Sequence, residues 1–375
     1  MGGSKLKKVV ILFFCVFLLY ACQKTQKNEE IDRDVENEGF TENIESVPVI
    51  THSPPIPFIS MSSSAFHSVI GWLSNDEIAF IMVDQGEWTV QVYSLTADSW
   101  RKIYTTEQPV IQASIHPTKD KILLHTSSNS STAEVQLIHI NGQLLDSLIF
   151  ESDELYMDWH PQNSSLIVFT TFYEDWTYNT FIYDGTTQSS ESIEVEDPFV
   201  KWYDEENLMV FRWAESNLDG GELILYSLKE KTLKETGITN IIDAQTNGNS
   251  LLVVQVNEET NEYQYSLSNK VTDESIDWTS PAISNYSEWV VPNMDFIDQD
   301  KLIGIKSLKP GNLDETTSAG TISSVTYDGK LEYGEIESQP LLCAPNGEVC
   351  LGGYQMENWI QLSPLIIQPW FNISN

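Results

Sequence analysis

The chain has 375 residues and a formal net charge of −35 at pH 7, because 55 acidic residues oppose only 20 lysines and arginines. Such an excess of negative charge argues strongly against nucleic acid and anionic lipid headgroups as partners, since phosphate binding needs clustered lysine and arginine. The acidity has two interpretations: it attracts cationic partners, or it only keeps a surface protein soluble.

Residues 1–21 have the order of a bacterial export signal. Lys5, Lys7 and Lys8 precede an uninterrupted apolar run over residues 9–20. The run is roughly a dozen residues long, and a helix rises about 1.5 Å per residue, so it is too short to cross a hydrocarbon core of about 30 Å. We therefore expect this segment to be removed after export.

The end of the signal carries a possible lipidation site. Leu19-Tyr20-Ala21-Cys22 resembles the lipobox of bacterial lipoproteins, in which a small residue precedes a cysteine. The resemblance implies cleavage before Cys22 and a diacylglyceryl group on its sulfur; an ordinary signal peptide is the alternative. Two acyl chains hold a protein stably on a membrane. We expect a lipid-anchored protein on the extracytoplasmic face of the cell membrane.

Residues 22–57 form a polar segment rich in Glu, Asp, Asn and Lys that ends in Ser53-Pro54-Pro55-Ile56-Pro57. Such a composition cannot bury enough apolar surface to offset the entropy lost on ordering. We interpret the segment as an acidic flexible tether that precedes a folded domain at 58–375.

The folded domain contains an internal repeat in which a short apolar strand ends in a turn and a second apolar strand follows. The first strands lie at 70–72, 113–117, 157–161, 200–202, 242–244, 294–296 and 342–344. The spacing is about 43 residues, rising to nearer 50 at the end. Two further strand candidates follow in each unit, and helical periodicity is absent.

Four short strands per unit, with turns rich in Asn, Asp, Gly and Pro, predict an all-β fold, a β-propeller of four-stranded blades. The repeat count favours seven blades, the last completed by a strand near residues 58–62. Six blades remain possible.

Two turns carry a family resemblance. The segments 114–123 and 158–167, with His116-Pro117 and His160-Pro161, resemble the Trp-Ser-Pro-Asp-Gly repeat of TolB-type propellers, with His in place of Ser. As a whole, the lipobox, acidic tether and propeller resemble the YqgU-like lipoproteins of Bacillus relatives. That resemblance covers nearly the whole chain and implies a six-bladed propeller, but no activity.

His116 and His160 occupy equivalent turns, so their rings either share a site on the axis or repeat a feature of the turn. The sequence contains no zinc, calcium or phosphate-binding motif and no nucleophile elbow, so we expect neither metal nor cofactor.

Cys343 and Cys350 flank a turn that contains Asn346-Gly347. If those two residues form a two-residue hairpin turn, the cysteines face each other, and outside the membrane they can form a disulfide. That register makes them a hydrogen-bonded pair with Cα atoms about 5.5 Å apart, which argues against the bond. The disulfide therefore stays a possibility.

The turns between the second and third strands, which share one face of a propeller, carry aromatic rings beside carboxylates. These candidate ligand-binding residues are Tyr173, Glu174, Asp175, Trp176, Trp213, Glu215, Asp219, Tyr354, Glu357 and Trp359. Rings beside carboxylates suit sugar faces or cationic groups, although they can also simply fill the space between blades.

We expect a non-enzymatic surface module that binds a protein or an envelope glycan through this face, in a scaffold or accessory role. The alternative is a hydrolase or lyase for envelope carbohydrate, with Glu174, Asp175, Glu215 and Asp219 as acid and base. Glycoside hydrolysis requires two carboxyl groups about 5 to 9.5 Å apart, a distance that sequence does not give.

Overall fold

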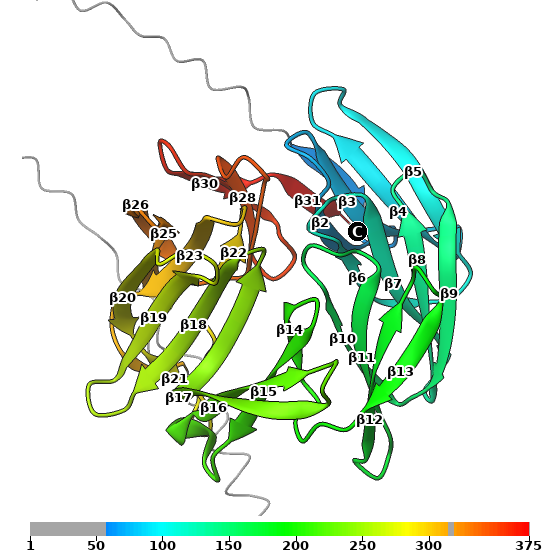
Figure 1. Cartoon of the computed structure of the whole chain (residues 1–375). Coiled ribbons are helices and arrows are strands. Elements are labelled where there is room, and N and C mark those ends of the chain that lie inside the picture. Colours follow the sequence, from blue (N-terminus) through cyan, green and yellow to red (C-terminus); the bar gives the residue numbers. More distant parts are fainter. Residues whose placement is uncertain (1–57, 314–318, 375) are drawn as a thin grey trace, which may run out of the picture. The chain divides into compact units, whose positions relative to one another are not determined.

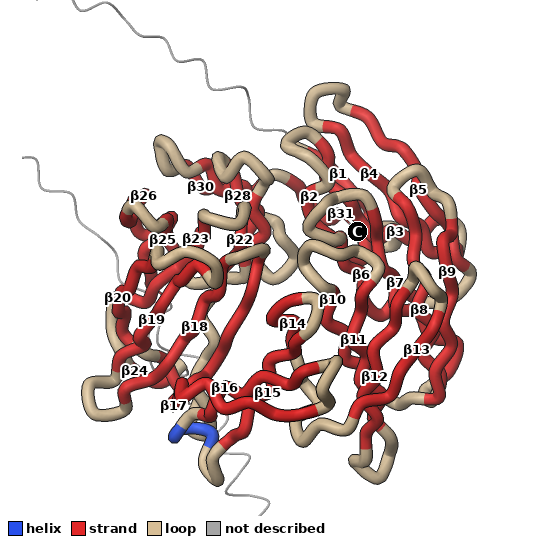
Figure 2. The backbone as a smooth tube through the Cα atoms, in the orientation of Figure 1, coloured by secondary structure: helices blue, strands red, loops and turns tan. Residues whose placement is uncertain are grey.

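The computed structural model describes residues 58–313 and 319–374. The expected export signal, Cys22 and the tether lie outside this part of the chain. Within it, no helix has the length and apolar character needed to cross a membrane. Helical structure there is limited to one 3₁₀ turn, η2 (Asn217–Asp219), drawn in blue in Figure 2.

The described strands form seven four-stranded antiparallel units in chain order, which Figure 1 shows around a common axis. The first three units are β2 (Phe66–Trp72), β3 (Glu77–Asp84), β4 (Glu87–Ser94) and β5 (Ser99–Thr106); β6 (Val110–Ile115), β7 (Lys121–Asn129), β8 (Thr132–His139) and β9 (Leu144–Glu151); and β10 (Glu154–Trp159), β11 (Leu166–Phe172), β12 (Tyr178–Asp184) and β13 (Ser189–Ile193). The fourth and fifth are β14 (Lys201–Asp204), β15 (Asn207–Trp213), β16 (Gly221–Ser227) and β17 (Thr232–Asn247); and β17 again with β18 (Ser250–Asn257), β19 (Glu262–Asn269) and β20 (Ser275–Pro281). The last two are β22 (Met294–Phe296), β23 (Lys301–Ser307), β25 (Ala319–Thr326) and β26 (Gly329–Glu337); and β27 (Leu341–Cys343), β28 (Val349–Gly352), β29 (Asn358–Gln361) and β30 (Ile366–Pro369). The all-β propeller predicted from the repeat is therefore confirmed.

One strand serves two units. The first part of β17 pairs with β16 and its last part pairs with β18, so the outer strand of the fourth unit continues as the inner strand of the fifth. Gly237 (φ +79°) and Asn240 (φ +55°) adopt left-handed conformations in the part that pairs with β16, where the pairing register shifts. Glycine and asparagine tolerate this conformation best, so the sequence permits the bend.

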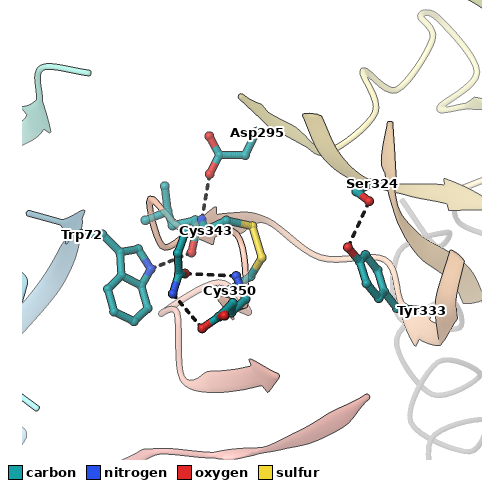
Figure 3. Close-up of a disulfide and its surroundings, with 9 residues drawn as sticks. Trp72, Asp295, Ser324, Tyr333, Cys343 and Cys350 are labelled. Carbon is teal, nitrogen blue, oxygen red and sulfur yellow. Dashed lines mark hydrogen bonds between the residues drawn. A yellow bond between two sulfur atoms is a disulfide. The ribbon is translucent and has the colours of Figure 1, made fainter. Parts of the chain in front are cut away.

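The ring closes between the seventh and first units. Strand β27 contacts β2, and the indole N–H of Trp72 donates a 2.9 Å hydrogen bond to the carbonyl of Leu342 (Figure 3). Trp202 makes the equivalent bond of 3.1 Å to the carbonyl of Asp158 between the third and fourth units. A tryptophan indole N–H therefore links neighbouring units at two different junctions of the ring.

The strand expected near residues 58–62 exists as β1 (Ile59–Ser62), but it does not complete the last blade. It pairs in parallel with β31 (Phe371–Ser374), because the seventh unit already has its own fourth strand in β30. A second parallel pair joins β21 (Ile283–Ser284) to β24 (Gly311–Asn312).

The core lies between the units. In β3, the five consecutive residues from Ile78 to Met82 are buried, since the second strand of each unit has a neighbouring unit on both faces. This double burial explains why the second strands are continuous apolar runs in the sequence.

A disulfide joins Cys343 to Cys350 across β27 and β28 (Figure 3). Cys343 lies opposite Cys350 as expected, but the expected two-residue turn was wrong: Gly347 N–H bonds to the carbonyl of Ala344, and Ala344 N–H bonds to the carbonyl of Val349. The turn is therefore centred one residue earlier than expected. The cysteines become the close, non-hydrogen-bonded kind of pair, with Cα atoms 3.9 Å apart.

Candidate ligand-binding pocket

A cavity of about 510 Å³ lies at the fourth and fifth units, on the face that carries the second-to-third-strand turns and the connections between units. Its residues come from the β13–β14 connection, from β14, β15 and β17, and from the connection that follows β20. Small-molecule and side-chain pockets commonly have volumes of roughly 300 to 1,000 Å³, so this cavity is large enough to hold a ligand group.

Four aromatic side chains line the cavity, those of Phe199, Phe211, Trp213 and Trp289. Phe199 is 50% exposed and Trp213 is 43% exposed, although both are large apolar groups. Trp289 donates its indole N–H to the carbonyl of Leu218 at 2.7 Å and so ties the connection after β20 to η2. Trp213 lies beside the ring of Phe211, with centroids 5.8 Å apart. The cavity therefore has an apolar wall that is open to solvent.

Charged groups lie beside this wall. The ammonium of Lys201, the first residue of β14, donates to the carboxylate of Asp243 at 2.5 Å and to the carbonyl of Ala244 at 3.3 Å. The carboxylate of Asp197 accepts the backbone N–H groups of Phe199 and Phe211, each at 3.0 Å. These bonds hold both carboxylates in fixed positions.

Burial strongly affects the acidic groups here. It raises the pKa of Asp197, against the opposing effect of its two N–H donors and Lys201. It also raises the pKa of Asp158 to about 6, although the Trp202 N–H and Lys201 favour the ionised form. Three carboxylates, those of Asp158, Asp197 and Asp243, thus interact with one ammonium group.

The turn of the third unit lies outside this cavity. Trp176 is 88% exposed at its tip, and the Tyr173 hydroxyl accepts a 2.9 Å hydrogen bond from the Asn179 amide. The Asp175 carboxylate accepts bonds from the hydroxyl and N–H of Thr177, which lower its pKa. Asp175 therefore shapes its own turn. Glu174 is exposed beside it.

The turn of the fourth unit reaches the cavity through one residue only. Trp213 lines it, whereas Glu215 and Asp219 are exposed on the turn and do not. Asp219 lies in η2, where its N–H bonds to the carbonyl of Ser216 at 3.0 Å.

The turn of the seventh unit is separated from the fourth by two units on one side and three on the other. Tyr354 is 90% exposed, and the Glu357 carboxylate accepts the N–H of Gln355 at 2.9 Å. Assigning Trp359 to the ligand surface was wrong. It is 7% exposed and packs against Trp72 and Trp370 in the core between the first and seventh units.

The rings of His116 and His160 hydrogen-bond to backbone groups of the turns that contain them. The Nε2 of His116 donates to the backbone carbonyl of His160 at 2.8 Å, and its Nδ1 accepts the N–H of Thr118. The Nδ1 of His160 accepts two backbone N–H groups of its own turn, from Gln162 and Asn163. These contacts support the interpretation as a repeated turn feature. In residues 58–313 and 319–374, no group of three or more His, Cys, Asp or Glu side chains is placed to hold a metal ion.

Sequence reasoning missed most of the cavity. The predicted site residues came only from the second-to-third-strand turns. The prediction therefore did not include Asp197, Phe199, Lys201, Asp243 and Trp289. The connections between units reach the same face of a propeller. The sequence offered one signal for these residues. Two connections between units place an acidic residue close to an aromatic one, in Asp197-Pro198-Phe199 and in Glu288-Trp289.

Comparisons with known proteins agree with this architecture. Residues 94–353 match the model of the YqgU-like 6-bladed beta propeller domain. The chain is 21% identical over 306 residues to the "Uncharacterized lipoprotein YqgU" of Bacillus subtilis, covering 81% of this chain and 84% of that one. The family description counts six blades, whereas the described part of this chain forms seven four-stranded units.

Two solved structures are similar to this chain to different degrees. The uncharacterized protein lmo1340 from Listeria monocytogenes EGD-e has a TM-score of 0.77 and 18% identity, covering 86% of this chain and 99% of that chain. TolB from Acinetobacter baumannii has a TM-score of 0.42 and 12% identity, covering 70% of this chain and 64% of that one. The similarity to the Listeria protein shows the fold alone, because the identity is low, and the similarity to TolB is too weak to carry an argument.

Proposed function

Because the chain belongs to the YqgU-like β-propeller family, we propose that it is a lipid-anchored, non-enzymatic module that binds a protein or envelope ligand outside the cell membrane. Membership confirms the resemblance expected from the sequence. The relative from Bacillus subtilis is called a lipoprotein, which supports an anchor at Cys22 of Leu19-Tyr20-Ala21-Cys22.

The observation that carries the binding role is the cavity at the fourth and fifth units. It combines half-exposed aromatic rings, Phe199 and Trp213, with charged groups already held in position, Lys201 and Asp243. When a ligand covers an aromatic ring that is open to water, the burial of apolar surface stabilises the complex. Side chains that are already held in place lose little conformational entropy on binding.

The same contacts favour binding over catalysis. Asp243 is paired with Lys201, and Asp197 is bonded to two backbone N–H groups, so neither is a free acid or base. Of the carboxylates proposed for a hydrolase or lyase, Glu174 and Asp175 lie on one turn and Glu215 and Asp219 on another, all outside the cavity.

Cross-linking on intact cells tests this function, with purification through a tag placed after Asn375. We expect a reproducible protein or glycan ligand that is retained by Tyr354→Ala, a variant of the same face outside the cavity, and lost in Trp213→Ala. Equal recovery from both variants would contradict the assignment of the cavity.

The catalytic alternative has its own outcome. Release of new reducing ends or unsaturated products from purified envelope carbohydrate, reduced by orders of magnitude in Glu174→Gln or Asp219→Asn, would replace the binding role by an enzymatic one. We expect no such release.

A further inference from the structure

The cavity has more negative than positive charge. Three carboxylates line it, those of Asp197, Asp243 and Glu288, against the single ammonium of Lys201, which pairs with Asp243. In the reduced dielectric of a pocket, this imbalance favours a cation over an anion or a neutral group.

The chain itself shows how a cation is held here. The Lys201 ammonium lies 5.8 Å from the centroid of the Phe211 ring while it bonds to the carboxylate of Asp243. The same combination of rings and carboxylates continues in the rest of the cavity. The rings there are those of Phe199, Trp213 and Trp289, and the carboxylates are those of Asp197 and Glu288. Aromatic faces attract ammonium and guanidinium groups most strongly where those groups are partly desolvated.

The surrounding surface points to a polypeptide as the source of that cation. On the neighbouring turn, Trp176 is 88% exposed between Asp175 and Thr177, with Glu174 also exposed, so apolar and acidic groups continue beyond the cavity. A net charge of −35 repels polymers that carry phosphate and attracts basic chains over a long range.

We propose that this cavity receives a lysine or arginine side chain of a basic polypeptide, with Trp213 and Phe199 against the cation and Asp197 and Glu288 as its counter-charges. The proposal rests on the function proposed above and narrows its ligand to a basic protein segment.

The test measures binding of a fluorescent arginine-rich peptide to the full-length lipidated protein in neutral detergent. The matched probe is the same peptide with citrulline in place of arginine, which keeps the shape and removes the charge. We expect the citrulline peptide to bind at least about tenfold more weakly. Equal binding of the two peptides would overturn the proposal.

Two variants with the same change of charge separate the cavity from general surface attraction. Glu288→Gln alters the edge of the cavity, and Glu230→Gln alters an exposed residue of the β16–β17 turn. Glu288→Gln and Trp213→Ala should weaken the arginine peptide by about fivefold or more, and Glu230→Gln by less than about twofold. Equal effects of Glu288→Gln and Glu230→Gln would show non-specific attraction and refute the site.

The cross-linking experiment distinguishes the two levels of failure. If Trp213→Ala loses its cellular ligand but the wild type does not prefer arginine over citrulline, the cavity is a binding site for a ligand that is not cationic. If Trp213→Ala keeps its ligand, the binding site itself is wrongly placed. Thermal unfolding of each variant confirms that it is folded.

Discussion

The carboxylate of Asp158 in β10 accepts a 2.9 Å hydrogen bond from the backbone N–H of Trp202 in β14, 44 residues further along the chain. Asp295 in β22 makes the equivalent contact with the N–H of Cys343 in β27, at 2.7 Å, as Figure 3 shows. Both aspartates directly precede an aromatic residue at the end of an inner strand. The acidic side chains thus fasten neighbouring units to each other.

Stability should depend on pH through Asp158. Burial raises its pKa to about 6, from 3.8 for an ordinary carboxyl group, so the folded protein keeps a proton that the unfolded chain releases. The stabilisation from this group is therefore present at low pH and is lost as pH rises through about 6. Asp158→Asn keeps an acceptor for Trp202 but removes the titration. Relative to the wild type, its free energy of unfolding should rise between pH 4.5 and 7.5 in urea denaturation. The exposed Asp153→Asn is the control, and a difference that does not change with pH would contradict this role.

His116 should have the opposite pH dependence. Burial lowers its pKa from 6.5, so the unfolded chain takes up the proton first and stability is lost as pH falls through 6.5. His116→Gln should cost about 1 to 3 kcal/mol at pH 7.5, because hydrogen-bonding groups of two turns lose a partner. That cost should shrink as pH falls to 5. The measurement is urea unfolding at several pH values, with His139→Gln at the β8–β9 turn as the control. A cost that stays constant would indicate that the ring remains accessible to protons in the folded state.

The disulfide should stabilise the seventh unit. It closes a short loop of sequence separation 7, and Cys350 is fully buried. Loop-closure entropy predicts that losing the bond costs roughly 2 to 3 kcal/mol. Dithiothreitol should lower the denaturation midpoint of the wild type to that of the double variant Cys343→Ala, Cys350→Ala. The double variant should itself not respond to the reductant, and a wild type that is unaffected by full reduction would contradict the prediction.

Trp359 should behave as a core residue. Since it is buried against Trp72 and Trp370, Trp359→Ala should lower the free energy of unfolding by about 3 to 5 kcal/mol. Tyr354→Ala, on the exposed turn before the same strand, should change it by no more than about 0.5 kcal/mol. Similar values for the two variants would place Trp359 back at the surface.

Lipidation at Cys22 is tested by replacing the sulfur. Cys22→Ala should leave an unprocessed precursor that incorporates no labelled fatty acid, whereas the wild type is labelled and shortened. Conversion of Cys343 and Cys350 to alanine should leave labelling intact. Labelled Cys22→Ala protein would overturn the assignment.

The sequence determined the elements of this fold because the information was local. A strand covered on both faces must be a continuous apolar run, and Ile78 to Met82 is such a run. Repetition of this pattern predicted the propeller. The double use of β17 was not predictable in this way, because it depends on pairing first with β16 and then with β18, and on left-handed backbone at Gly237 and Asn240 where the first pairing shifts register.

The candidate site was decided by the tertiary structure. Asp197, Lys201, Asp243 and Trp289 come from segments that meet only when the fourth and fifth units pack together, so no spacing in the sequence marks them. Trp213 and Trp359 follow similar local patterns, an aromatic ring near a carboxylate at a turn, yet one lines a cavity and the other is buried. The difference arises because Trp359 meets the first unit across the ring closure, a contact between the two ends of the domain.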